Sequence, residues 1–156
     1  MRLTEEQKRA NKVQRVLDRF KGLSIGKCVG EVASKLLAIR RIESIDRNGN
    51  LTCCSCGKVE VAAGHGFDGG HWIGRSRGSV VLDRRNINAQ CVACNRFGTG
   101  ATKAGYDEFM RRTYGQDVMD ELRRKSSEIK QWTKDELAEL YVQFSEELSK
   151  IERGTT

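Results

Sequence analysis

Two C-x-x-C pairs are the part of this chain best equipped to bind a metal ion. The first pair is Cys53 and Cys56, with Gly57 directly after it, and the second pair is Cys91 and Cys94. Each pair presents two sulfur atoms from one tight turn. Four thiolates complete the tetrahedral set that structural zinc prefers, at distances of about 2.3 Å. The spacing therefore predicts a structural Zn²⁺ site made by all four cysteines.

Two other uses of these cysteines fit the sequence less well. A redox C-x-x-C motif would leave the second pair without a role. A disulfide framework needs an oxidising compartment, whereas the first residues, MRLTEEQKRANK, lack the apolar segment of a secretory signal. No apolar run approaches the roughly 20 residues that span a bilayer. We therefore expect a cytoplasmic protein with no membrane partner. Cys28 and Cys54 are expected to be ordinary small residues, since Cys54 would chelate less well than Cys53.

The zinc site alone does not account for any catalysis. With four sulfur ligands the ion has no open position for water, and the site carries a net negative charge. Phosphodiester chemistry here would need a second, hard cation bound by oxygen and nitrogen ligands. His71 and Asn86 lie between the two cysteine pairs, and Asn95 directly follows the second pair. These side chains are the candidates for that chemistry.

Three motifs carry a family resemblance. They are Asp68-Gly-Gly-His71-Trp-Ile-Gly-Arg75, then Asp83-x-x-Asn86, and finally Gln90-Cys91-x-x-Cys94-Asn95-Arg-Phe97-x-x-Gly100. Together they resemble the NinG (Rap) recombination endonuclease family of lambdoid phages, within the HNH, or His-Me finger (ββα-metal), nucleases. The resemblance runs from about Cys53 to the region of Tyr141, and the amino-terminal arm matches more loosely.

The resemblance implies a role for each matching residue. His71 would be the general base, since its near-neutral pKa suits proton abstraction at physiological pH. Asn95 would bind a catalytic Mg²⁺ or Mn²⁺ that stabilises the developing charge. Asn86 would hold the loop and orient His71, and Arg75 or Arg77 would bind the phosphate. The substrates would be branched recombination intermediates such as Holliday junctions and D-loops, in the host cytoplasm.

The sequence departs from most HNH sites at one position. An acid or a second histidine usually precedes the general base and binds the metal, but here that residue is Gly70. Asp68, three residues before His71, is the best replacement, and His65 is a weaker one. The NinG pattern has the same glycine, so the departure fits the family but leaves the second protein ligand open between Asp68 and His65.

The distribution of charge favours a nucleic-acid partner. The net charge is +7, and residues 1–52 contribute 12 basic and 6 acidic side chains, while residues 101–156 contribute 10 and 12. Such a basic excess is expected where a protein meets a phosphate backbone. An ordinary solvated surface would explain the total but not its uneven distribution. The expected DNA-binding side chains follow one face of an amino-terminal helix and surround His71: Lys8, Lys12, Arg15, Arg19, Arg75, Arg77, Arg84, Arg85 and Arg96.

The apolar pattern predicts an α+β fold, with a zinc-bound ββα finger flanked by helices. A capping box at Thr4 opens a first helix that ends near Lys21. Further elements are expected as follows: a loop over 22–30, a helix over 31–41, a loop over 59–70, strands over 71–73 and 86–90, a short helix from Cys91, helices around 106–114 and 118–129, and a last helix capped by Thr133. We expect three segments, namely a basic helical arm (1–47), a nuclease core (48–100) and a helical region (101–156).

These observations favour a metal-dependent DNA endonuclease. Because a paired cut across a four-way junction requires two active sites, we expect a homodimer formed through the carboxy-terminal helices. The main alternative is a zinc-ribbon module that binds DNA without cutting it, and a second is an accessory protein that recruits recombination factors. The zinc-ribbon module explains the cysteines and the charge but gives His71 and Asn95 no role.

Overall fold

The computed structural model describes residues 2–154 and confirms the α+β class. Within these residues there are six α-helices and two antiparallel sheets of two strands each. The described residues divide into two compact units, one made by residues 2–39 and 131–154 and the other by residues 40–130. The residues before Arg40 and those after Lys130 therefore belong to the same unit.

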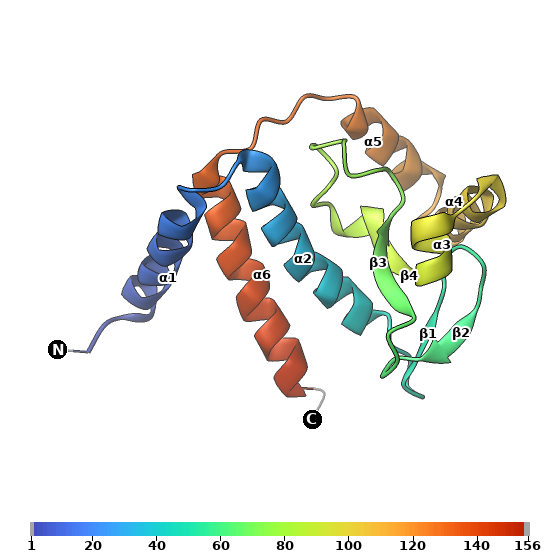
Figure 1. The fold of residues 1–156 in the computed structure, drawn as a ribbon, viewed down its shortest axis with the longest axis horizontal. Helices are drawn as coiled ribbons and strands as arrows, with labels where there is room; N and C mark the ends of the chain where they lie inside the picture. Colours follow the sequence, from blue (N-terminus) through green and yellow to red (C-terminus); the bar gives the residue numbers. More distant parts are fainter. Residues whose placement is uncertain (1, 155–156) are drawn as a thin grey trace. The chain divides into compact units, whose positions relative to one another are not determined.

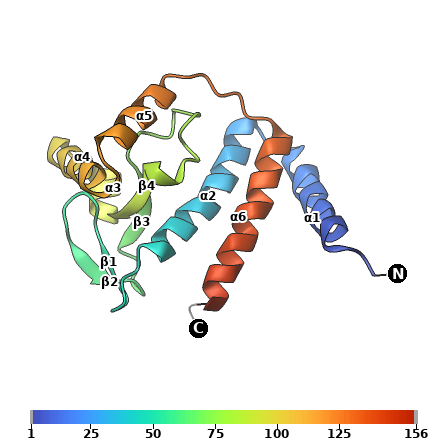
Figure 2. The same cartoon turned by 180° about the vertical axis from the view of Figure 1, so that it is seen from behind.

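The first unit is helical. It contains α1 (Glu5–Phe20), most of α2 (Ile25–Glu43) and α6 (Lys134–Gly154). The expected capping box opens α1. The Thr4 hydroxyl oxygen accepts a hydrogen bond from the Gln7 amide, and the Gln7 side-chain oxygen accepts one from the Thr4 amide. α1 lies alongside α6 in both views (Figures 1 and 2). The ring of Phe20, which is fully buried, meets Tyr141 edge to face at 5.9 Å between centroids.

The expectation of a loop over residues 22–30 was wrong, because α2 begins at Ile25. Glycines at positions 26 and 30 suggested a loop, since each costs a helix about 1 kcal/mol relative to alanine. The helical apolar repeat nevertheless starts earlier than expected, and Cys28, Val32, Leu36 and Ile39 are all fully buried. Burial of a whole apolar face outweighs two unfavourable glycines.

The second unit contains both sheets. β1 (Asn50–Thr52) pairs with β2 (Val59–Val61), and β3 (Phe67–His71) pairs with β4 (Ile87–Cys91). A short 3₁₀ turn, η1 (Arg84–Asn86), precedes β4, and α3 (Val92–Phe97) follows it directly. α3 packs against both β3 and β4. The order is therefore strand, strand, helix, followed by α4 (Gly100–Tyr114) and α5 (Gln116–Ser126).

The strands near the cysteines differ from those expected. The segment 59–70 is not a loop, since it contains β2 and most of β3. The first strand of the hairpin ends at His71 instead of beginning there, and β4 begins one residue later than expected. Glycines at positions 69 and 70 concealed β3, because glycine is depleted in strands. Ile129 lies beyond α5 and is 91% exposed, so it is not part of that helix.

Two apolar clusters hold the second unit together. One lies between the strands and the cysteine segment and includes Leu51, Phe67 and Ala89. The other joins Trp72 and Val80 to helices α4 and α5 through Met110 and Leu122. The residues around the hairpin are thus supported on both sides. Among the helices described here, none combines the length and the apolar character needed to cross a membrane.

Candidate metal centre and adjoining hairpin

The sulfur atoms of Cys53, Cys56, Cys91 and Cys94 form one cluster, as the spacing predicted. All four lie within 4.8 Å of one another. A tetrahedral zinc ion with bonds of about 2.3 Å separates its sulfur ligands by about 3.8 Å. The Sγ atoms of Cys56 and Cys91 are 3.9 Å apart. The four cysteines can therefore hold a zinc ion with little rearrangement.

The chain turns tightly around this cluster. Cys53 follows β1, and its carbonyl accepts a hydrogen bond from the Gly57 amide at 3.0 Å. Gly57 has a backbone φ of 75°, a conformation that residues other than glycine rarely adopt. The amides of Ser55 and Cys91 donate to Cys53 Sγ at 3.4 and 3.3 Å. Such N–H···S bonds favour the thiolate that a metal requires.

Cys54 and Cys28 lie outside the sulfur cluster, in agreement with the sequence analysis. Burial raises the pKa of Cys54 to about 12, and the neighbouring Cys53 adds to the effect. Its side chain belongs to the apolar cluster around Trp72. Cys28 is fully buried in α2. Both side chains are therefore buried core groups.

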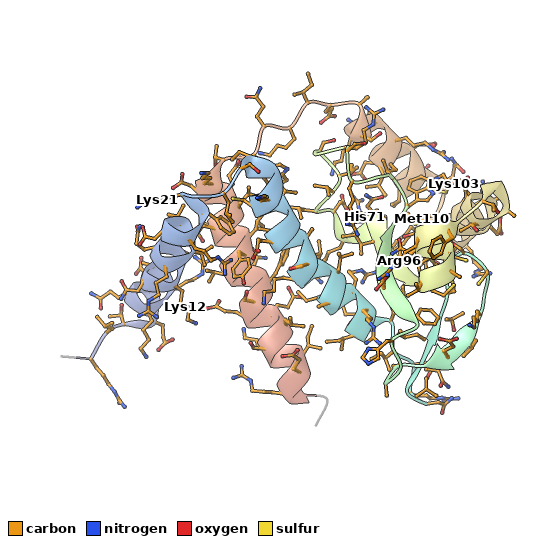
Figure 3. All side chains as sticks on the ribbon, in the orientation of Figure 1. Lys12, Lys21, His71, Arg96, Lys103 and Met110 are labelled. Atoms are coloured by element: carbon orange, nitrogen blue, oxygen red, sulfur yellow. The ribbon has the colours of Figure 1, made fainter. Side chains whose placement is uncertain are left out.

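His71 is the last residue of β3 (Figure 3). Its Nε2 lies 3.0 Å from the carbonyl oxygen of Val81. An imidazole that donates from Nε2 to a carbonyl keeps its lone pair on Nδ1. Nδ1 is buried and has no hydrogen-bond partner among the described residues. The pKa of His71 is lowered by burial and by the positive charge of Arg75, while the bond to Val81 opposes this shift. The ring is thus held neutral, and its basic nitrogen is unpaired and buried.

Asn86 holds the loop that carries Val81. Its side chain accepts from the Ile73 amide at 2.7 Å and donates to the carbonyls of Ile73 and Val80 at 3.0 Å each. Asn86 is fully buried, and its bond to the Val80 carbonyl is buried as well. The Asn86 carbonyl also accepts from the Trp72 amide at 2.9 Å. Asn86 therefore fixes the residues on either side of the His71–Val81 contact, without touching the imidazole itself.

Asp68 and Asn95 contact each other where α3 packs against β3. Asn95 Nδ2 donates to Asp68 Oδ2 at 3.3 Å, and Arg96 Nη2 reaches the same oxygen at 3.4 Å. Asp68 comes from β3, whereas Asn95 and Arg96 (labelled in Figure 3) come from α3. His65 is exposed between β2 and β3. In the described part of the chain no hydrogen bond joins His71 to Asp68 or to Asn95.

The arginines around the hairpin fall into two groups. Arg75 and Arg77 are exposed and form no ion pair among the described residues, so they are available to a ligand. The others are engaged: Arg84 with Glu43, Arg85 with Asp83 and Glu121, and Arg96 with Asp68.

The basic face of α1 is engaged in part. Lys8 pairs with Glu5, Lys12 with Glu146, and Arg19 with Glu31, at 2.6, 2.7 and 3.2 Å. Arg19 also lies over the ring of Tyr141, 4.6 Å from its centroid. Arg15 is exposed and has no ion pair among the described residues. Of the expected stripe, Arg15 is therefore the side chain most available to a phosphate.

Several supporting residues were not singled out from the sequence. The Tyr106 hydroxyl donates to the carbonyl of Gly70 at 2.7 Å, directly before His71. Trp72, directly after His71, donates from Nε1 to Asp107 at 2.6 Å. The only hint in the sequence was that the aromatic residues of α4 follow one another at spacings of three and five, which could not identify their partners. The backbone on both sides of His71 is anchored to α4.

Together, the fold and the cysteine cluster define a small α+β protein with a four-sulfur site that can hold zinc. The family model described as bacteriophage lambda NinG protein matches residues 2–154, and the chain belongs to this family. Searches among curated proteins and among solved structures returned no match.

Proposed function

We propose that this protein is a metal-dependent, structure-selective DNA endonuclease of the HNH (His-Me finger) class. Its substrates would be branched intermediates of recombination, such as Holliday junctions and D-loops. Membership of the NinG family supports a role in phage recombination. The strand–strand–helix order around the cysteine cluster supports the assignment to the HNH class.

The contact between Asp68 and Asn95, at 3.3 Å, is the observation that carries this proposal. Successive residues of a strand point to opposite faces, so Asp68 lies on the same face of β3 as Gly70. That face is the one from which the usual HNH ligand, directly before the base, would project. Because Asn95 donates an amide hydrogen to Asp68, its side-chain oxygen remains for a cation. Asp68 is therefore favoured over the exposed His65 as the second ligand.

The residues divide the reaction among them. A bound Mg²⁺ or Mn²⁺ would stabilise the charge that develops on the phosphate and on the leaving 3′-oxygen. Asp68 and Asn95 would hold it, since carboxylate and amide oxygens suit these ions. His71 would take a proton from the attacking water at Nδ1, while Val81 keeps its Nε2–H in place. The products would carry 3′-hydroxyl and 5′-phosphate ends.

Binding of the substrate would fall to exposed cations. Arg75 and Arg77 lie on the loop after β3 and would contact the scissile phosphate. Arg15 on α1 would contribute further contacts with phosphates. A paired cut in a four-way junction would require two copies of the protein, so a homodimer is part of the proposal. A monomeric mass in solution at micromolar concentration would contradict that part.

The test compares two histidine variants on one substrate. The chain has two histidines, so His65→Ala is a matched control for His71→Ala. Zinc-loaded proteins would be incubated with an end-labelled four-way junction and a linear duplex, in Mg²⁺ or Mn²⁺. We expect cleavage of the junction by wild type and by His65→Ala, and a loss on the order of 100-fold or more in His71→Ala. Equal cleavage by both variants would contradict the proposal. Binding without any cleavage by wild type would favour a zinc module that only binds DNA.

A further inference from the structure

Gly70 is a glycine for a reason of space and not of backbone conformation. Its φ is not positive, so an ordinary side chain could adopt the same backbone. An added Cβ would, however, overlap Oε1 of Gln90 and lie 2.9 Å from Gln90 Cδ. The side chain of Gln90 thus lies across the position that a residue-70 side chain would occupy, directly beside His71.

The carboxamide of Gln90 is fixed in this place. Gln90 is only 5% exposed, and its Nε2 donates to Ser55 Oγ at 2.7 Å. No hydrogen bond from the described residues reaches its Oε1. Among the described residues, the buried side-chain atoms without a partner are His71 Nδ1 and Ser145 Oγ, so Oε1 of Gln90 keeps contact with solvent although the rest of its side chain is buried. An oxygen that is fixed in place and reached by solvent is open to a cation.

Gln90 also lies on the same face of the β3–β4 hairpin as Asp68. It is the register partner of Asp68 in the β3–β4 pair. Side chains directly opposite one another in such a pair point to the same side, with Cβ atoms about 5 Å apart. Asp68 in turn contacts Asn95. Three oxygen-bearing side chains, from β3, β4 and α3, therefore gather on one side of the hairpin.

We infer that Gln90 is a third protein ligand of the divalent cation, supplying Oε1 above Gly70. The inference depends on the proposed function, because it adds a ligand to the same site. Together Asp68, Gln90 and Asn95 would give one carboxylate and two neutral oxygens. Water would complete a shell of six, as Mg²⁺ and Mn²⁺ usually require.

The inference is tested by Mn²⁺ affinity, measured by electron paramagnetic resonance on zinc-loaded protein without DNA. We expect Gln90→Leu, which keeps the approximate volume, to weaken binding about tenfold or more. Gln90→Glu should tighten it, because a second carboxylate faces the cation. Gln116→Leu, the same change on the exposed surface of α5, should leave the affinity unchanged. Zinc content and thermal unfolding would identify a variant that loses affinity only because it misfolds.

A double variant that moves the proposed ligand from residue 90 to residue 70 provides a second test, in which metal binding should be regained instead of lost. Gly70→Asp combined with Gln90→Ala places a carboxylate in the space that the glutamine leaves, so Mn²⁺ binding should recover relative to Gln90→Ala alone. If Asp68→Asn loses Mn²⁺ while Gln90→Leu and Gln90→Glu both bind like wild type, Gln90 is not a ligand and the proposed function stands. Absence of Mn²⁺ binding by zinc-loaded wild type would overturn both.

Discussion

Asn95 donates a hydrogen bond to Asp68 at 3.3 Å, although 27 positions separate the two residues in the chain. Asn95 directly follows Cys94, one of the four clustered cysteines, and Asp68 lies on β3. The bond therefore links the helix that follows the candidate zinc site to β3, the strand that ends at His71. A metal that fixes the start of α3 also fixes the position of Asn95 relative to Asp68.

Asp68→Asn should remove the negative charge at this contact while it keeps the hydrogen bond with Asn95. The asparagine keeps an oxygen that can accept from Asn95 Nδ2, so we expect zinc content and the unfolding midpoint to stay close to wild type. Loss of the carboxylate should lower the cleavage rate in Mg²⁺ on the order of 100-fold, since the cation would lose its only anionic protein ligand. Single-turnover cleavage of a labelled junction measures this. A rate equal to that of wild type would exclude Asp68 as a ligand.

The pH dependence of cleavage should follow the neutral form of His71. Its pKa lies below the ordinary 6.5, because burial disfavours the imidazolium and Arg75 repels it. As the pH falls through this pKa, Nδ1 gains a proton and can no longer act as a base. We expect a rate that is level above about pH 6.5 and falls tenfold per unit at lower pH. A single-turnover profile with an apparent pKa clearly above 6.5 would contradict this assignment.

The lowered pKa of His71 also makes the free energy of unfolding depend on pH. Between the two pKa values the unfolded chain binds a proton that the folded protein does not, so stability decreases as the pH falls. The contribution is fully present above about pH 6.5 and is lost as the pH falls toward and through the folded pKa. Urea unfolding of wild type at a series of pH values, compared with His71→Ala, would isolate it.

The sequence predicted the zinc cluster well because its spacing is a local property. Two sulfurs from one C-x-x-C turn are close whatever the rest of the chain does, and two such pairs have few other uses. The capping boxes at Thr4 and Thr133 were likewise predictable, since each depends on a side chain three residues away. The α+β class followed from these local patterns.

Residues whose role depends on strand register could not be predicted in the same way. Gln90 lies over Gly70 only because Asp68 pairs with Gln90 in the hairpin, and that register is not visible in the spacing. β3 itself was missed because two glycines interrupt its strand pattern. Arg85 was expected to contact DNA, and its ion pair with Glu121 depends on the packing of α5, which the local sequence does not show.

Removal of one zinc ligand should unfold the second unit selectively. Cys56 is the exposed member of the cluster, so Cys56→Ala removes a ligand and little packing. Structural zinc contributes on the order of 10 kcal/mol to small domains, so we expect loss of the metal and of the fold around it. Zinc measured by atomic absorption, together with amide exchange of β3 and β4, tests this. Cys28→Ala should retain one zinc ion per chain, and loss of zinc there would contradict the assignment.

Asn86→Ala should destabilise the second unit without removing zinc. The change deletes three hydrogen bonds to Ile73 and Val80, which leaves the Ile73 amide and carbonyl without these partners, whereas the Val80 carbonyl keeps its bond from the Asp83 amide. We expect a loss of about 3 kcal/mol in the free energy of unfolding. Asn48→Ala, at an exposed turn, should change it by less than about 0.5 kcal/mol. Chemical denaturation measures both, and a similar effect of the two substitutions would contradict the role given to Asn86.

Arg15→Ala should weaken DNA binding with a defined dependence on salt. Arg15 is free of ion pairs among the described residues and lines a hollow of about 640 Å³ with Lys12 and Lys150. Each phosphate contact contributes about 0.9 to the slope of log affinity against log salt concentration. Loss of Arg15 should therefore reduce the magnitude of that slope by about 0.9, measured by fluorescence anisotropy on a labelled four-way junction. Lys12 already pairs with Glu146, so Lys12→Ala should change the slope less. An unchanged slope in Arg15→Ala would show that α1 does not contact the phosphates, and the basic excess of the amino-terminal arm would then serve another purpose.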